Sequence, residues 1–293
     1  MTHSLPPETH IGTVHLTVHD LDNAIAFYER SLGFATWSCQ DGVARLGSHL
    51  AEGAQAGASP LLVLHHDPES MPAYRTTGLY HFAVLVPSRL ELARVLRRLA
   101  ETRTPLEGFA DHLVSEAIYL HDPEHNGIEI YRDRPRDEWR FVDGRLAMAT
   151  DPIDLEGISH ELAGHEEPWD GLHPDTMMGH IHLRVADIPA ANQFYVNQVG
   201  FDLMQLMGPS ASFVSAGGYH HHIGMNTWES RGAMPPPDGS TGLRWYELRF
   251  PDAKTVGEVA GRVRKSGSPV EEHEEGLLVR DPFHIGVMLT AES

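Results

Sequence analysis

Hydrophobic and polar positions follow a pattern that begins near the N-terminus and returns later in the chain. From His10 onward β-prone residues alternate, and an Asp-Leu turn, a stretch of helical periodicity and a Gly-Phe pair follow. In the helical stretch Leu21, Ile25 and Tyr28 share one face, and Gly33 follows as a stop signal. The pattern predicts a strand, then a helix that ends at Gly33, then another strand.

A second copy of this pattern starts at Met178. Ile188, Phe194 and Tyr195 form the apolar positions of its helical stretch, and Gly200 is the stop. Self-similarity at this scale indicates a structural unit that was used more than once.

Two weaker copies start at Gly78 and Gly242. Each opens with a strand, passes through a proline into an amphipathic helix, and reaches an Asp-Pro turn before its last strand. The chain is therefore predicted to be an α+β protein of four βαβββ modules, near residues 8–70, 74–135, 176–232 and 240–292.

The length and the segment after Pro135 predict how these modules are grouped. A chain of 293 residues is long enough for two domains. The segment 136–175 is rich in Asp, Glu, His and Gly, as linkers often are. We therefore expect one domain over residues 1–135 and a second over 176–293.

Composition narrows the partners and the compartment. The 22 Lys plus Arg residues against 41 Asp plus Glu give a net charge of −19, which disfavours nucleic acid and anionic membrane. Cys39 is the single cysteine, so an intramolecular disulfide or a cysteine metal cluster is excluded. No signal peptide and no apolar run of about 20 residues is visible. These features predict a cytoplasmic protein.

The candidate chemistry lies on the strands. Matching positions of the four opening strands carry His15, His81, His182 and Trp245. On the closing strands Glu129 of the second module matches Met288 of the fourth. Each histidine could be a hydrogen-bonded core residue, and Glu129 could pair with an arginine. Two imidazoles and one carboxylate on one face, however, are the ligand set of a non-haem Fe(II) oxygenase.

Several stretches carry a resemblance to a known family: HIHLRV, GLYHFAVLVPSR, DHLVSEAIYLHDPEHNGIEIYRDRP and SAGGYHHHIGMNTW. With the four-module layout, they make the chain similar to the vicinal oxygen chelate superfamily and, within it, to the two-domain catechol 2,3-dioxygenases. The resemblance implies an extradiol ring-cleaving enzyme that uses O₂ on an aromatic diol. It also implies one Fe(II), or Mn(II), held by two histidines and one glutamate.

Family members usually hold the metal in the C-terminal half, and this sequence departs from that pattern at Trp245 and Met288. Two ligand sets remain, and both contain His81 and Glu129. Pairing the first two modules would add His15, whereas pairing the second and third would add His182. We favour His182, because the run of three histidines that starts at His220 would place an acid–base residue in the same pair of modules.

The resemblance also assigns roles around the metal. His222 is the favoured acid–base residue, with His221 and His220 as alternatives. Tyr119 matches an active-site Tyr of the family and His112 stands where a second-sphere His is expected, so both are expected to hydrogen-bond the substrate oxygens. Each of these could instead be an ordinary strand or loop residue.

Other functions are compatible with the same modules. A hydroquinone dioxygenase would keep the ligand set, and a glyoxalase-like isomerase or lyase would use more carboxylate ligands. A binding protein without catalysis would need no His-His-Glu set. The ring substituents of the substrate are not readable, although Phe82, Phe213 and Trp228 are candidate wall residues. The repeated sheet edges allow a homo-oligomer.

Overall fold

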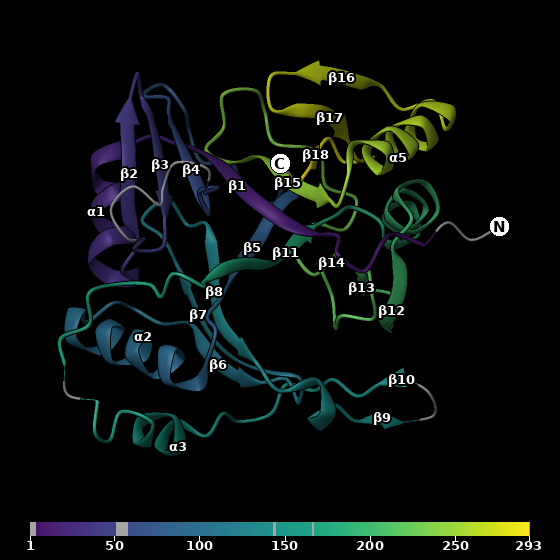
Figure 1. The fold of residues 1–293 in the computed structure, drawn as a ribbon. Coiled ribbons are helices and arrows are strands. Elements are labelled where there is room, and N and C mark those ends of the chain that lie inside the picture. The colour runs from purple at the N-terminus through teal and green to yellow at the C-terminus, as the bar shows by residue number, and fades with distance from the viewer. Residues whose placement is uncertain (1–3, 51–57, 143–144, 166, 293) are drawn as a thin grey trace. The chain divides into compact units, whose positions relative to one another are not determined.

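A computed structural model describes residues 4–50, 58–142, 145–165 and 167–292. The first module contains β1 (His10–Val18), α1 (Leu21–Leu32), β2 (Ala35–Gln40), β3 (Val43–Gly47) and β4 (Leu62–His66). The second contains β5 (Gly78–Leu85), α2 (Arg89–Thr102), β6 (Gly108–Asp111), β7 (Ser115–His121) and β8 (Gly127–Asp133). Both modules have the predicted βαβββ order (Figure 1).

The second half repeats this order. The third module contains β11 (Met177–Arg184), α4 (Ile188–Asn192), η2 (Gln193–Val199), β12 (Asp202–Met207), β13 (Ala211–Ser215) and β14 (Ile223–Asn226). The fourth contains β15 (Gly242–Phe250), α5 (Ala253–Lys265), β16 (Val270–His273), β17 (Gly276–Arg280) and β18 (Gly286–Ala291). The segment between the halves carries η1 (Arg136–Glu138), β9 (Phe141–Val142), β10 (Arg145–Leu146) and α3 (Leu155–His160).

The four modules contribute their strands to two eight-stranded sheets. One sheet has the order β16-β17-β18-β15-β1-β4-β3-β2 and the other β12-β13-β14-β11-β5-β8-β7-β6. The first sheet thus contains strands of modules one and four, and the second contains strands of modules two and three. The α+β class and the four-module organisation are confirmed.

The chain forms two compact units, one from residues 1–17, 70–80 and 179–293 and one from 18–69 and 81–178. In the first unit α5 packs on β15 and β18. In the second, α1 packs on β2 and β4, and α2 packs on β8. The predicted division into one domain over residues 1–135 and another over 176–293 concerns independent folding, and it stays a prediction.

The helices begin and end largely where the sequence predicts. The Asp20 side chain accepts a hydrogen bond from the Asn23 backbone N–H at 3.0 Å and caps α1. Gly33 follows with φ 69°, a left-handed conformation that favours glycine. Gly200 ends the third-module helix in the same region, at φ 108°. That helix differs from the prediction, because after Asn192 it continues as wider π-helical turns.

Among the helices of the described residues, none is both long and apolar enough to cross a membrane. The longest amphipathic helix, α2, has 14 residues. The amphipathic helices α1, α2 and α5 bury their apolar faces against the sheets.

Both Asp-Pro turns are fixed by a buried tyrosine from the preceding module. The Tyr28 hydroxyl donates to Asp122 at 2.8 Å, and the Tyr195 hydroxyl donates to Asp281 at 3.0 Å. Burial raises the pKa of Asp281 to about 6, against the lowering effect of the hydrogen bonds it accepts. Burial also raises the pKa of Asp122. These bonds join a helix to the turn that leads into β8 or β18, and β8 carries Glu129.

Candidate metal centre

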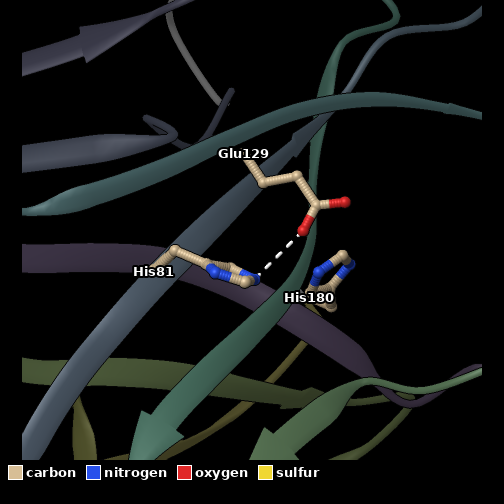
Figure 2. A group of neighbouring side chains, drawn as sticks. All are labelled: His81, Glu129 and His180. Atoms are coloured by element: carbon tan, nitrogen blue, oxygen red, sulfur yellow. Dashed lines mark ion pairs between the residues drawn. The ribbon is translucent and has the colours of Figure 1, made fainter. Parts of the chain in front are cut away.

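His81 and Glu129 form a buried pair on neighbouring strands. Strands β5 and β8 are parallel, with Ala83 opposite Glu129, and alternation places His81 on the same face as Ala83. His81 Nε2 lies 3.0 Å from Glu129 Oε2 (Figure 2). The two residues are 7% and 2% exposed. A carboxylate this deeply buried is stable only when it is paired or bound to a cation.

His180 completes a group with these two residues. One ligand atom from each of His81, Glu129 and His180 lies within 4.8 Å of the others. Figure 2 shows the three side chains turned toward one another. His180 lies on β11 and is 1% exposed. Two imidazole nitrogens and a carboxylate oxygen are the donors that a non-haem Fe(II) or Mn(II) ion takes, so the residues fit such an ion.

The structure brings His180 into this group, whereas the sequence favoured His182. His182 Nε2 instead lies 3.0 Å from the Asn226 side-chain nitrogen. The two histidines are two residues apart on β11, so they share a face and lie about 7 Å apart along the strand. Strand alternation alone therefore cannot choose between His180 and His182 as the metal ligand.

The repeat alignment added to this ambiguity. Counted back from the residues that cap the module helices, His81, His180 and Trp245 each lie seven residues before their caps, which are Ser88, Asp187 and Asp252. His15 and His182 lie only five residues before their caps, Asp20 and Asp187, so matching them with His81 was two residues out of register. The HIH pattern on β11 was the signal for His180, since it offers two histidines on one face.

His15, the other candidate for the third ligand, belongs to a separate group. Its Nε2 lies 3.9 Å from Glu247 and 3.9 Å from Glu275. Arg249 Nε donates to Glu247 at 2.8 Å. Burial would raise the pKa of Glu247, but the contacts with His15 and Arg249 lower it to about 2. Because Arg249 already balances the charge of Glu247, this group is the weaker metal candidate.

The fourth module departs from the ligand pattern as the sequence predicts. Glu247 lies opposite Met288, as Ala83 lies opposite Glu129 in the second module. Trp245 therefore occupies the place of His81, and its ring stacks on His15 at 4.6 Å. Met288 is fully buried.

The sequence predicts that the three consecutive histidines lie on the closing strand of the third module, but they lie in the loop just before that strand, β14. His222 Nδ1 accepts a hydrogen bond from the Ala216 backbone N–H at 3.2 Å. Its ring centroid lies 4.9 Å from that of Tyr219, and the residue is 7% exposed. These contacts hold His222 in the protein interior and occupy one of its two nitrogens.

The ring of His221 packs against the ring of His180. Its ring centroid is 4.2 Å from that of His180. His221 Nδ1 lies 2.8 Å from His220 Nδ1, and only one of these two atoms can carry the shared hydrogen. At least one of these two imidazoles is therefore neutral and can accept a proton.

Tyr119 and His112 form a hydrogen-bonded chain next to the His81–Glu129 pair. Tyr119 lies opposite Glu129 in the β7–β8 register, and its ring is 5.6 Å from that of His81. His112 Nδ1 lies 2.7 Å from the Ala149 carbonyl and its Nε2 lies 2.6 Å from Tyr119 Oη. A carbonyl only accepts, so Nδ1 carries the hydrogen. In neutral His112, Nε2 then accepts from the Tyr119 hydroxyl.

Ala149 was missed by the sequence reasoning, because a backbone carbonyl has no side-chain signature. The segment that carries it pairs with β6 through an isolated bridge between Asp111 and Asp151. The segment after Pro135 therefore does more than connect two halves, since it fixes the tautomer of His112.

Sequence comparison relates the chain to one superfamily. Residues 10–130 match the family model of the Glyoxalase/Bleomycin resistance protein/Dioxygenase superfamily. The chain is 43% identical over 283 residues to a protein named Catechol-2,3-dioxygenase from Bacillus subtilis (strain 168), with 95% of this chain and 96% of the relative covered.

Solved structures show the same fold. A Bacillus subtilis protein proposed to be a dioxygenase superposes with a TM-score of 0.62 at 13% identity, covering 100% of this chain and 86% of that one. Glyoxalase I from Zea mays superposes with a TM-score of 0.57 at 14% identity, covering 97% and 93%. The chain belongs to the glyoxalase/bleomycin resistance protein/dioxygenase superfamily. Within it, the chain is of the catechol 2,3-dioxygenase type.

Proposed function

We propose that this protein is an Fe(II)-dependent extradiol dioxygenase, which inserts O₂ into a catechol-type diol and gives a ring-opened semialdehyde. The observation that carries the proposal is the buried group of His81, Glu129 and His180 in a chain 43% identical to a catechol-2,3-dioxygenase. Mn(II) suits the same donors.

The three ligand residues would hold the ion with one negative charge from Glu129. When bound, a divalent ion lowers the pKa of a coordinated hydroxyl, so that a diol loses a proton at neutral pH. With a single carboxylate and two neutral imidazoles, the protein leaves positive charge on the ion for an anionic diol. More carboxylate ligands, as in a glyoxalase-like reaction, would remove that charge.

His221 is the residue that we propose to accept and return the substrate proton. We favour it over His222 because its ring centroid lies 4.2 Å from that of His180, a proposed metal ligand. General acid–base catalysis of this kind typically contributes about 10²–10⁴ in rate.

Tyr119 and His112 would orient the diol. Since the Tyr119 hydroxyl donates to His112, the lone pairs of Tyr119 Oη are left to accept from a substrate hydroxyl. The Ala149 carbonyl keeps this direction fixed by holding the hydrogen of His112 on Nδ1. Both sequence-based assignments thus stay as proposals, with a defined hydrogen-bond direction.

A cytoplasmic location is part of the same proposal. A reducing compartment would keep the iron ferrous and would leave Cys39, the single cysteine, as a thiol.

Oxygen consumption tests the proposed reaction. We expect the enzyme, reconstituted anaerobically with Fe(II), to consume one O₂ per catechol and to form a product that absorbs near the visible range. The activity should disappear when a chelator removes the iron, because the metal is required to ionise the diol. An oxygen electrode and an absorption spectrum measure both effects.

Other outcomes of this experiment would point elsewhere. Uptake with a para-diol but not with catechol would assign the enzyme to hydroquinone cleavage. Bound metal with no uptake on either diol would contradict a dioxygenase and favour an isomerase or lyase.

A further inference from the structure

An aromatic wall surrounds His182. We use this name for the side chains of Tyr80, His182, Phe213 and Trp228. The ring of His182 lies 5.1 Å from Tyr80, 5.7 Å from Phe213 and 5.7 Å from Trp228. The rings of Tyr80 and Trp228 are themselves 5.4 Å apart, edge to face. Edge-to-face and tilted contacts at these separations stabilise aromatic clusters.

The wall begins next to the proposed metal ligand. His182 and His180 share one face of β11, two residues apart. Phe213 provides a second connection, because its ring is 5.2 Å from His221, which in turn is 4.2 Å from His180. A continuous series of ring contacts therefore runs from His180 and His221 through Phe213 and His182 to Trp228.

Solvent exposure of the side chains rises along this series of rings, from His180 to Trp228. His180 is 1% exposed and His182 is 5% exposed, whereas Trp228 is 51% exposed. A half-exposed indole leaves apolar area in water that an apolar group could cover. The outer end of the wall is thus the part that can gain most from a flat ligand.

Asn226 holds the wall in position. Its side-chain nitrogen lies 3.0 Å from His182 Nε2, and its side-chain oxygen accepts from the Trp228 backbone N–H at 3.2 Å. Since an amide nitrogen only donates, His182 Nε2 is the acceptor. The Arg184 guanidinium lies 5.4 Å from the ring of Tyr80 and donates to the Leu79 carbonyl at 2.9 Å. The rings are therefore held before any ligand arrives.

We propose that the aromatic wall binds a flat apolar substituent on the ring of the diol, so that the enzyme prefers aryl-substituted catechols to catechol. This inference rests on the proposed function, which places the two hydroxyls of the diol at the end of the wall near His180. A substituent directed along β11 would then lie against His182 and Phe213 and reach Trp228. Differences in one apolar group between substrates typically give about 10–200-fold discrimination.

The test compares 4-phenylcatechol with catechol in the Fe(II)-loaded full-length enzyme. Trp228→Ala is expected to lower the preference for 4-phenylcatechol about tenfold, measured as a ratio of anaerobic binding constants by calorimetry and as a ratio of kcat/KM. The loss should lie mainly in KM, because the wall contacts a part of the substrate that does not react. Met234→Ala is the matched control, since it also truncates an exposed apolar side chain, 76% exposed, outside the wall.

The two readouts separate the inference from the proposed function. If the wild-type enzyme consumes no O₂ with either diol, the proposed dioxygenase activity fails, and the calorimetric ratio still decides whether the wall binds the phenyl group. A wild-type enzyme that binds both diols equally, or a Trp228→Ala ratio equal to that of Met234→Ala, would overturn the inference.

Discussion

Replacing Glu129 with glutamine is expected to remove the metal from the enzyme and to lower ring-cleaving activity by more than about 100-fold, beyond the usual effect of an outer-shell change. Glutamine keeps the shape of the side chain but removes its charge, and Glu129 is the single carboxylate of the group with His81 and His180. Metal content per chain after reconstitution and desalting measures the loss, and oxygen uptake measures its consequence.

The second histidine–carboxylate group offers a matched control. Glu247→Gln makes the same change at a buried glutamate that contacts His15, and it should leave the metal content unchanged. It should lower thermal stability instead, because Arg249 loses its carboxylate partner. Metal retained in Glu129→Gln, or lost in Glu247→Gln, would contradict the assignment.

A pair of histidine variants distinguishes the two positions on β11. His180→Ala should lose the metal as Glu129→Gln does, whereas His182→Ala should keep it and change the preference among diols. The reverse result would restore His182 as the ligand.

Replacing His221 with alanine is expected to lower kcat by about 10²–10⁴ while the metal stays bound. The physical reason is that its ring, 4.2 Å from that of His180, is the proposed proton acceptor for the diol. Steady-state oxygen uptake with catechol measures kcat, and metal analysis of the same preparation shows that the site is intact.

His222→Asn is the control for this change. Asparagine can still accept from the Ala216 N–H, so we expect a modest loss of stability and a kcat close to that of the wild type. If His222→Asn slowed turnover more than His221→Ala, the sequence-based assignment of His222 would be correct.

The repeat in the hydrophobic pattern predicted the modules well, because each module is a local unit. Helix ends at Gly33 and Gly200 follow from residues next to them in sequence, so they could be predicted. The candidate site favoured pairing the second module with the third, and these two modules do share a sheet. No residue pattern indicates that β1 and β15, which lie far apart in the chain, are neighbours in the other sheet, since strand edges can pair in several ways.

The site was predictable as a set of residue types and less so as a set of positions. His81 and Glu129 stand out because a histidine and a carboxylate in apolar strands require a partner. His180 and His182 have the same alternation, so they are distinguished by their spacing from the helix cap at Asp187, which for His180 equals the spacing of His81 from Ser88. His221 and His222 lie in a loop, where the period-2 rule does not apply, so the side of each ring could not be predicted.

The number of metal ions per chain tests the central claim most directly. Anaerobic titration of the metal-free full-length enzyme with Fe(II) should show one tight site per chain, because only the group of His81, Glu129 and His180 combines two imidazoles with a carboxylate in the described residues. Glu129→Gln should then show none. Two sites would mean that the group of His15, Glu247 and Glu275 also binds metal, and no site in the wild type would contradict the assignment of a metal centre.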